Sequence, residues 1–412
     1  MKKQTVSLKG ECVLKQEMKM VALPHTSDIG YDLEFLSLDT AKKVRDFHRS
    51  FPMYCETPLA HLPETASAIG LGDIYVKDES YRFGLNAFKV LGGSFAIGNY
   101  LAKHLNKTID QISYATLMDP AVKQELGDLT FVTATDGNHG RGVAWTANQL
   151  GMKSVVYMPK GSAQERLENI RAAGADASIT DLNYDEAVRL ANRQAEEKGW
   201  IMVQDTAWDG YEEIPTWIMQ GYGTMGLEAY EHLPEKPTHI FLQAGVGSMA
   251  GAITGIFSAI YGKERPVIAI VEPNKADCLF RTAEANDGTL HVVTGDMDTI
   301  MAGLACGEPC SIGWNVLNDY ADYFISCPEY VAAKGMRILG NPAGKDDRVI
   351  SGESGAAAFG AVAEIMTNPE LAAMKEALGL DENSRVLCFS TEGDTDKENY
   401  KAIVWDGKYC KE

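Results

Sequence analysis

Short apolar runs alternate with longer amphipathic segments along most of this chain, beginning near residue 129. Apolar runs of about five residues, each followed by a turn and a helix-length segment, are typical of parallel strands joined by crossover helices. The pattern therefore predicts a protein of the α/β class. The clearest predicted strands are residues 129–135, 154–158, 201–205, 239–243, 267–271 and 386–390.

The pattern is less regular in the first third of the chain. Residues 73–76 are expected to form another strand and residues 87–105 a helix, although Gly92 and Gly93 weaken the helical propensity. The first 23 residues alternate polar and apolar positions and lack the continuous apolar stretch of a signal peptide. We expect them to form a strand or arm at the surface.

Length and charge narrow the class of protein further. The chain has 412 residues, more than one hydrophobic core usually supports, so we expect two domains around a cleft. Hydrophobic residues make up 45% of the chain and charged residues 23%, which are globular proportions. The formal net charge of −19 disfavours nucleic acid and anionic lipid as partners.

The sequence has no apolar run of about 18 residues, the length that a membrane span needs. Together with the absent signal peptide, this leads us to expect a cytoplasmic protein. The eight cysteines are scattered, and Cys306 with Cys310 has no second Cys/His pair to bind zinc. We expect reduced thiols and no metal site, with a regulatory bridge between Cys278 and Cys306 as the alternative.

A glycine-rich turn follows the predicted strand 239–243. Residues 244–251 read AGVGSMAG and lead into an apolar helix. Glycines let the backbone approach a ligand closely, and the N–H groups and dipole at a helix start favour a phosphate. The turn has neither the lysine of a P-loop nor the GxGxxG of dinucleotide-binding folds. A tight turn selected only for helix packing is the alternative interpretation.

Lys89 ends the segment KDESYRFGLNAFK, residues 77–89, which we call the lysine segment. A lysine with an ordinary pKa of about 10.4 is almost wholly protonated at neutral pH, so a nucleophilic lysine needs desolvation or positive neighbours. The start of a predicted helix supplies positive potential, and Phe88, Val90 and Leu91 argue against full solvation. An ordinary surface lysine is the alternative.

The predicted strand 129–135 runs into the turn TDGNHG, residues 135–140. Hydroxyl, amide and backbone N–H groups come together in this turn, as recognition of a substrate carboxylate requires. Thr135, Gly137 and His139 are therefore candidates for substrate binding. His139 taken alone is equally compatible with a structural role in the turn.

The order of these segments resembles the fold type II pyridoxal phosphate (PLP) enzymes, relatives of tryptophan synthase β and threonine dehydratase, from about residue 55 to the C-terminus. More narrowly, seven blocks are similar to the diaminopropionate ammonia-lyase family: KDESYRFGLNAFK, TATDGNHGRG, YMPKGSAQER, VQDTAW, IMAGLACGEP, SGESGA and STEGDTD.

The resemblance implies two open, mainly parallel twisted sheets flanked by helices, with PLP in the cleft between two domains. The larger domain would comprise residues 1–91 and 203–412 and the smaller one residues 92–202. The resemblance also suggests a homodimer.

The resemblance assigns cofactor roles residue by residue. Lys89 matches the lysine that carries PLP as a Schiff base, and Asn138 matches the residue that hydrogen-bonds the 3′-oxygen of the ring. Ser390 or Thr391 occupies the place of a hydroxyl or thiol against the pyridine nitrogen, and a neutral partner there suits elimination. The phosphate-binding loop matches Gly245, Val246, Gly247, Ser248 and Met249.

Asp136 departs from the general family pattern, which has a small residue beside Gly-Asn. A carboxylate in a loop that receives a carboxylate is costly, so Asp136 is expected to face a cation or to act as a base. The molecule 2,3-diaminopropionate offers an amine that serine and threonine lack. Asp205 in VQDTAW is a second catalytic candidate, and a capping or turn role is the alternative for both residues.

These assignments lead us to expect an α,β-elimination that converts 2,3-diaminopropionate, in both D and L forms, to pyruvate and ammonia. Lys89 would take the Cα proton of one enantiomer and Asp136 that of the other, while Asp136 or Asp205 keeps the leaving amine protonated. A serine or threonine dehydratase of the same fold is one alternative. A non-catalytic amino-acid-binding protein is the alternative from another class.

Overall fold

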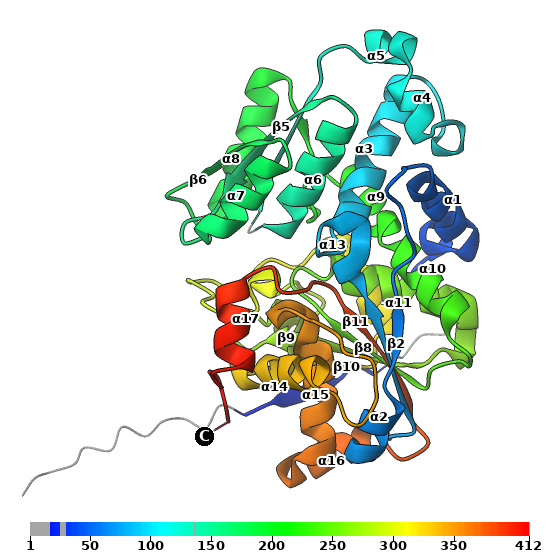
Figure 1. The fold of residues 1–412 in the computed structure, drawn as a ribbon, viewed down its shortest axis with the longest axis vertical. Coiled ribbons are helices and arrows are strands. Elements are labelled where there is room, and N and C mark those ends of the chain that lie inside the picture. The colour runs from blue at the N-terminus through cyan, green and yellow to red at the C-terminus, as the bar shows by residue number, and fades with distance from the viewer. Residues whose placement is uncertain (1–16, 25–29, 136, 412) are drawn as a thin grey trace, which may run out of the picture.

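Two separate sheets, one of seven strands and one of four, organise the chain (Figure 1). The structure is a computed structural model that describes residues 17–24, 30–135 and 137–411. Helices cover the sheets, which confirms the predicted α/β class with two open, mainly parallel sheets. The seven-stranded sheet has the order β1 (Lys19–Ala22), β10 (Tyr323–Cys327), β9 (Val267–Pro273), β8 (His239–Gln243), β11 (Arg385–Ser390), β3 (Asp73–Asp78) and β2 (Leu59–His61).

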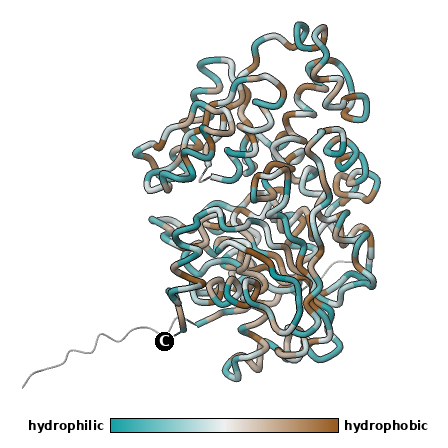
Figure 2. The backbone as a smooth tube through the Cα atoms, in the orientation of Figure 1, coloured by the Kyte–Doolittle hydropathy of each residue, from teal (hydrophilic) through white to brown (hydrophobic). Residues whose placement is uncertain are grey.

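The five central strands of the seven-stranded sheet run parallel, and β1 and β2 close its two edges antiparallel. Both faces are covered, because Ile240 and Leu242 of β8 join one apolar core with helix α11 (Ser248–Tyr261), while Phe241 joins the other with α15 (Glu353–Thr367). A strand buried on both sides has apolar residues at consecutive positions. This burial explains the continuous apolar runs in the sequence, which Figure 2 shows in brown.

The four-stranded sheet is parallel throughout, in the order β6 (Asp176–Ile179), β5 (Lys153–Met158), β4 (Thr130–Ala134) and β7 (Ile201–Met202). All its strands lie between residues 130 and 202, and the strands of the larger sheet lie on either side of that stretch. The proposed domain boundaries at residues 92 and 202 stay a prediction. The sheet is covered by α6 (Asn138–Gln149), α7 (Gln164–Ala172) and α8 (Tyr184–Lys198).

Several predicted elements differ from the observed ones. Strand β7 ends at Met202, three residues before the predicted end, because the Tyr211 hydroxyl bonds the N–H of Gln204 and the carbonyl of Met202. Strands β2, β6 and β10 were not predicted, and the alternating exposure of β6 explains its weak apolar signal. In the N-terminal region, β1 pairs with β10 at a sheet edge, and residues 1–16 lie outside the described residues.

Helix α3 (Val90–His104) begins immediately after Lys89 and packs against α9 (Glu213–Gly221). A Cβ atom on Gly92 would lie 2.7 Å from side-chain atoms of both Ile218 and Tyr222. The glycine that lowers helical propensity is therefore the residue that permits this close packing. The helices not yet placed are α1 (Leu38–Arg49), α2 (Pro63–Ile69), α4 (Tyr114–Met118), α5 (Pro120–Leu126), α10 (Gly223–His232), α12 (Cys278–Ala285), α13 (Ser311–Tyr320), α14 (Glu329–Gly340), α16 (Ala372–Leu378) and α17 (Lys397–Val404).

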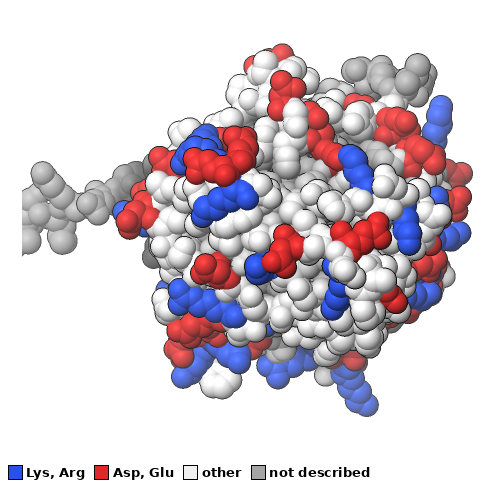
Figure 3. Space-filling model, turned by 90° about the horizontal axis from the view of Figure 1, so that it is seen from above, with Lys and Arg blue, Asp and Glu red and all other residues white. Residues whose placement is uncertain are grey.

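On the face of the molecule that Figure 3 presents, Lys and Arg side chains lie interspersed with Asp and Glu. The negative net charge is thus not gathered into one acidic patch on this face. No helix in the described ranges is long and apolar enough to cross a membrane.

Candidate active site

One pocket collects residues that follow the carboxyl ends of five parallel strands, β3, β4, β7, β8 and β11. Ligands of open α/β sheets bind outside the carboxyl ends of the strands, and here the ends come from both sheets. The lining includes Phe88, Lys89, Asn138, Asp205, Tyr222, Gln243, residues 244–250, Cys306, Ser354, Thr391 and Glu392.

Lys89 and Asp205 form an ion pair in this pocket. Lys89 Nζ lies 2.6 Å from Asp205 Oδ2, with 18% and 6% of the respective side chains exposed. His139 Nδ1 is 3.8 Å from the same carboxylate oxygen. Burial alone would raise the pKa of Asp205, but Lys89 and His139 outweigh it and hold that pKa well below its usual value. Asp205 is therefore an anion at neutral pH, placed against the amine of Lys89.

The glycine-rich turn after β8 lies where the sequence predicts it and leads directly into α11. Gly247 has a φ of +97°, a left-handed conformation that favours glycine. A Cβ on Gly245 would lie 3.2 Å from the Leu304 backbone and 3.3 Å from Cys306 Sγ. The Ser248 hydroxyl donates to the Asp205 carbonyl oxygen at 2.7 Å. The backbone N–H groups of this turn and of the first turn of α11 are therefore the candidate donors to an anion.

Among the described residues of the turn after β4, Asn138 lines the pocket. Its Nδ2 donates to Glu392 Oε2 at 2.6 Å. Thr135, Gly137 and His139 are buried beside the pocket, outside its lining, where the Thr135 hydroxyl accepts from the Gly137 N–H and the His139 ring contacts the Val203 carbonyl. Their assignment to the substrate stays a prediction. Asp136 lies outside the described residues.

The structure distinguishes between the hydroxyls of Ser390 and Thr391, which the sequence left as alternatives. Thr391 lines the pocket, and its Oγ1 accepts from Gln243 Nε2 at 2.8 Å. The hydroxyl of Thr391 therefore keeps its own proton for another acceptor. Ser390 lies outside the pocket lining and donates to Ser351 Oγ at 2.8 Å. Its assignment to the cofactor has no geometric support, because side chains alternate between the faces of a strand.

Sequence reasoning did not single out Glu392, Ser354, Phe88, Cys306 or Tyr222 as pocket residues. The first two stand in the blocks STEGDTD and SGESGA, so the signal for them was present and unassigned. Tyr222 lies between α9 and α10 and carries no local sequence signal. Only packing brings it to the pocket.

The cysteines near the pocket carry free thiols. Burial raises the pKa of the Cys278 thiol well above its usual value, and the neighbouring Glu272 and Cys306 add to this effect. A raised pKa keeps a thiol protonated and unreactive. Within the described ranges, no cluster of three or more His, Cys, Asp or Glu side chains is arranged to hold a metal ion.

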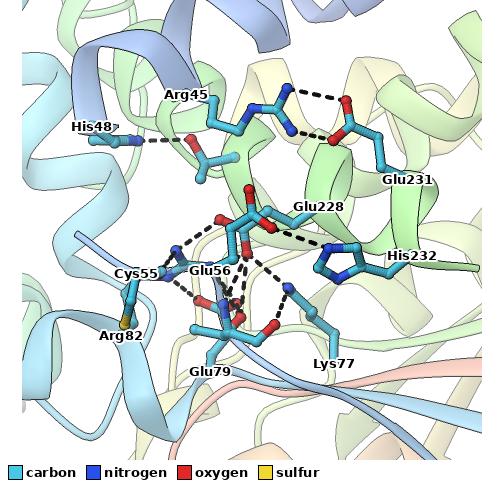
Figure 4. Close-up of polar contacts among 12 residues, drawn as sticks. Arg45, His48, Cys55, Glu56, Lys77, Glu79, Arg82, Glu228, Glu231 and His232 are labelled. Atoms are coloured by element: carbon cyan, nitrogen blue, oxygen red, sulfur yellow. Dashed lines mark hydrogen bonds and ion pairs between the residues drawn. The ribbon is translucent and has the colours of Figure 1, made fainter. Parts of the chain in front are cut away.

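A buried ionic network joins the lysine segment to helix α10 (Figure 4). Arg82 contacts Glu79 at 2.8 Å and Glu228 of α10 at 2.7 Å, and Lys77 contacts Glu228 at 2.7 Å, all four side chains being wholly buried. Burial alone would raise the pKa of Glu228, but Arg82 and Lys77 lower that pKa by more than burial raises it and keep this carboxyl ionised. The charged side chains of Lys77, Glu79 and Arg82 therefore belong to the protein interior, whereas Tyr81, in the same segment, is exposed.

The residues of the pocket fit PLP. The glycine turn, which a Cβ atom would fill, and the first N–H groups of α11 suit a phosphate. Lys89 supplies the amine that an aldehyde requires. Thr391 supplies a hydroxyl whose proton can be donated to a ring nitrogen. These residues therefore match the phosphate, the aldehyde and the ring nitrogen of the cofactor.

Comparison with known proteins agrees with this chemistry. A family model described as pyridoxal-phosphate dependent enzyme matches residues 51–392, and this defines the class that the fold and the pocket indicate. The diaminopropionate ammonia-lyase of Salmonella typhimurium is 54% identical over 92% of this chain and 95% of its own, and that of Escherichia coli is 50% identical over 91% and 93%. The chain belongs to the diaminopropionate ammonia-lyase family of pyridoxal-phosphate dependent enzymes.

Solved structures lead to the same family. Crystalline holo diaminopropionate ammonia lyase from Escherichia coli superposes with a TM-score of 0.90 at 46% identity, covering 97% of this chain and 99% of that one. A second crystal structure of that enzyme, in complex with an aminoacrylate-PLP azomethine reaction intermediate, superposes with a TM-score of 0.89 at 46% identity, covering 96% and 99%.

Proposed function

We propose that this protein binds PLP in the pocket and eliminates the β-amine of 2,3-diaminopropionate, in both D and L forms, to yield pyruvate and ammonia. The observation that carries the proposal is the pairing of Lys89 with a buried, ionised Asp205 beside a phosphate-binding turn. Lys89, Asn138, Thr391 and the turn 245–249 would hold the cofactor. When bound, PLP withdraws electrons from the substrate and acidifies its Cα–H bond.

Each reacting proton needs a group of this chain to move or hold it. Lys89 would take the Cα proton of one enantiomer. Asp205 has a lowered pKa and is therefore a weak proton acceptor but a strong partner for a cation. We assign it to the β-amine, which leaves readily only when it is protonated on the substrate, so that it departs as neutral ammonia. Expulsion as ammonia leaves an enamine, which water hydrolyses to pyruvate and a second ammonia.

Asp136 is proposed as the base for the other enantiomer. Its support is its position in the sequence, directly after Thr135 and two residues before the pocket residue Asn138. A base on the face opposite Lys89 is required if both configurations are to react. The lining of the pocket also favours a diamino acid over serine, because it contains two carboxyl groups, Asp205 and Glu392, against one lysine.

The assembly and location proposed for the protein are those of a cytoplasmic homodimer. Support comes from the family to which the chain belongs. Fractionation of the native cells would contradict the location if the protein sedimented with membranes or appeared outside the cytoplasm.

The proposed reaction is tested with purified holoprotein and four substrates: D- and L-diaminopropionate, serine and threonine. We expect a visible absorbance band from bound PLP, and pyruvate formation from both diaminopropionates at least about tenfold faster than from serine. A Lys89→Ala control is expected to lose the band and the activity. Serine turnover equal to that of diaminopropionate would identify a dehydratase, and a protein that binds without forming any 2-oxo acid would contradict catalysis.

A further inference from the structure

Glu392 is held in place from several directions. Its side chain is 3% exposed, Oε1 accepts from the Ser354 N–H at 3.2 Å, and Oε2 accepts from Thr395 Oγ1 at 3.4 Å. Its backbone bridges to Ala87 of the lysine segment and accepts from the Gly352 N–H at 2.9 Å. A carboxyl group so constrained has little freedom to turn. It presents a fixed pair of oxygens at the edge of the pocket.

The closest contact of this carboxyl group is with Asn138, 254 residues earlier in the chain, whose Nδ2 lies 2.6 Å from Glu392 Oε2. An asparagine amide has one end that donates and one that accepts, and a carboxylate only accepts. The contact therefore selects the orientation in which the NH₂ group of Asn138 faces Glu392. One hydrogen of that NH₂ group is used, and the second remains available to the pocket.

We propose that Glu392 is a positioning residue that fixes the Asn138 amide so that it presents an N–H donor to the cofactor in the pocket. The inference rests on the proposed function, in which PLP occupies this site. The oxygen on the PLP ring is an acceptor, so a donor must face it. An amide turned the other way would present its carbonyl oxygen, and two acceptors would repel each other.

The substitution Glu392→Gln removes the preference for one orientation of the Asn138 amide and hardly changes the side-chain volume. A glutamine amide can donate to the Asn138 carbonyl as readily as it accepts from the NH₂ group. Asn138 would then adopt both orientations. We expect PLP to dissociate from the E392Q holoenzyme about tenfold or more faster than from the wild type, the usual effect of losing a hydrogen bond to a charged group.

Glu353 offers a matched control. It is 2% exposed, and burial together with the nearby Glu392 raises its pKa to about 7. Its Oε1 accepts from Asn399 Nδ2 at 2.5 Å, and the residue is outside the pocket lining. At pH 8.5, Glu353→Gln removes one buried charge from the same neighbourhood while leaving the Asn138 contact intact. We expect its PLP dissociation rate to stay within about twofold of the wild type.

The experiment measures PLP release from holoenzyme, after dilution into a PLP scavenger at pH 8.5, and the pH dependence of the visible absorbance band. The set is wild type, E392Q, E353Q, N138A and the double variant N138A/E392Q. If Glu392 acts through Asn138, E392Q accelerates release in the wild-type background and adds nothing in the N138A background. It also shifts the pH at which the band titrates, which E353Q leaves in place.

Additive effects of N138A and E392Q, or equal acceleration by E353Q, would overturn the inference. Should E392Q not fold, a crystal structure of wild-type holoenzyme decides: Asn138 Nδ2 within hydrogen-bond distance of both Glu392 and the ring oxygen supports it, and Glu392 turned away from Asn138 overturns it. A wild type without a PLP band overturns the proposed function and this inference together. A PLP-loaded wild type with an unaffected E392Q overturns the inference alone.

Discussion

At the scale of single residues, the Lys89–Asp205 contact defines the chemistry of the site. The amine of Lys89 keeps the carboxylate of Asp205 charged in a buried place, where an unpaired ion is costly. Because its pKa in the folded protein lies below the ordinary value, the pair stabilises the fold at neutral pH, and that stabilisation is lost as the pH falls through the acid range. The charge that the reaction needs is thus maintained by the amine beside it.

Two matched substitutions separate the roles of the two aspartates. We expect Asp205→Asn to lower kcat/KM for D- and L-diaminopropionate alike, by about 100-fold or more, because the leaving amine loses its anionic partner. Asp136→Asn is expected to lower kcat/KM for the D isomer and to retain substantial activity on the L isomer. Steady-state kinetics on both isomers measure this. Equal losses on both isomers for Asp136→Asn rule out Asp136 as the base on the opposite face.

The raised pKa of Glu353 predicts that the stability of the protein depends on pH. Its pKa is raised from 4.5 to about 7 in the folded protein, first by burial and then by Glu392, so the folded state binds the proton more tightly than the unfolded state. Stability contributed by this group is therefore present below pH 4.5 and is lost as the pH rises to about 7. Relative to Glu353→Gln, the wild type is expected to lose about 3 kcal/mol of unfolding free energy between pH 4.5 and pH 8.

Denaturant titrations at several pH values measure that difference. Glu398→Gln is the control, since Glu398 is exposed on α17 and the same substitution there should leave the pH profile unchanged. If the stability of the Glu353→Gln variant parallels that of the wild type at every pH, Glu353 does not have a raised pKa in the folded protein.

At the scale of elements, the lysine segment is fixed at both of its ends. The ionic network of Lys77, Glu79, Arg82 and Glu228 holds its first half. Its second half runs beside the C-terminal block, where the Phe88 N–H donates to the Thr391 carbonyl at 3.0 Å. Between these ends Phe83 adopts a φ of +49°, a strained conformation for a bulky residue that surrounding contacts must maintain.

Removing one charge from the network is expected to be strongly destabilising. Arg82→Met leaves Glu79 and Glu228 buried with one cation fewer, at a cost of about 3–5 kcal/mol in unfolding free energy. Lys103→Met is the matched control: Lys103 also lies 2.7 Å from its partner, Glu213, but both side chains are more than half exposed, so about 1 kcal/mol or less is expected. Denaturant unfolding compares them, and equal losses contradict a buried, interlocked network.

At the scale of the whole molecule, the pocket joins the two sheets. Asp205 and Asn138 follow strands of the four-stranded sheet, and their partners Lys89 and Glu392 follow strands of the seven-stranded sheet. Ser248 adds a third contact of the same kind, to the Asp205 backbone. The distance between Lys89 and Asp205 therefore depends on how the two sheets pack. The division into a large and a small domain stays a prediction.

The proposed homodimer is tested on intact holoprotein. Size-exclusion chromatography with light scattering is expected to give twice the mass of one chain, unchanged over a hundredfold range of protein concentration, since interfaces between permanent partners are large and apolar. A mass equal to that of one chain throughout this range excludes the dimer.

Much of this architecture could be predicted from local patterns. Strand 239–243, the turn after it and the helix start at Lys89 appear where the sequence indicates them, because burial on both faces and the backbone freedom of glycine leave short-range signatures. Strand β6, which is only partly buried, has no such signature. The buried charges of the lysine segment were missed for a related reason: their partner Glu228 is 146 residues away from Arg82.

The sequence by itself determined the α/β class, the phosphate turn and the lysine, since each depends on neighbours within a few positions. Only the tertiary structure decided that Thr391 and not Ser390 lines the pocket, that Asp205 pairs with Lys89, and that Glu392 orients toward Asn138. These pairings join residues far apart in the chain across two sheets. Their geometry depends on how the sheets pack, which no local pattern specifies.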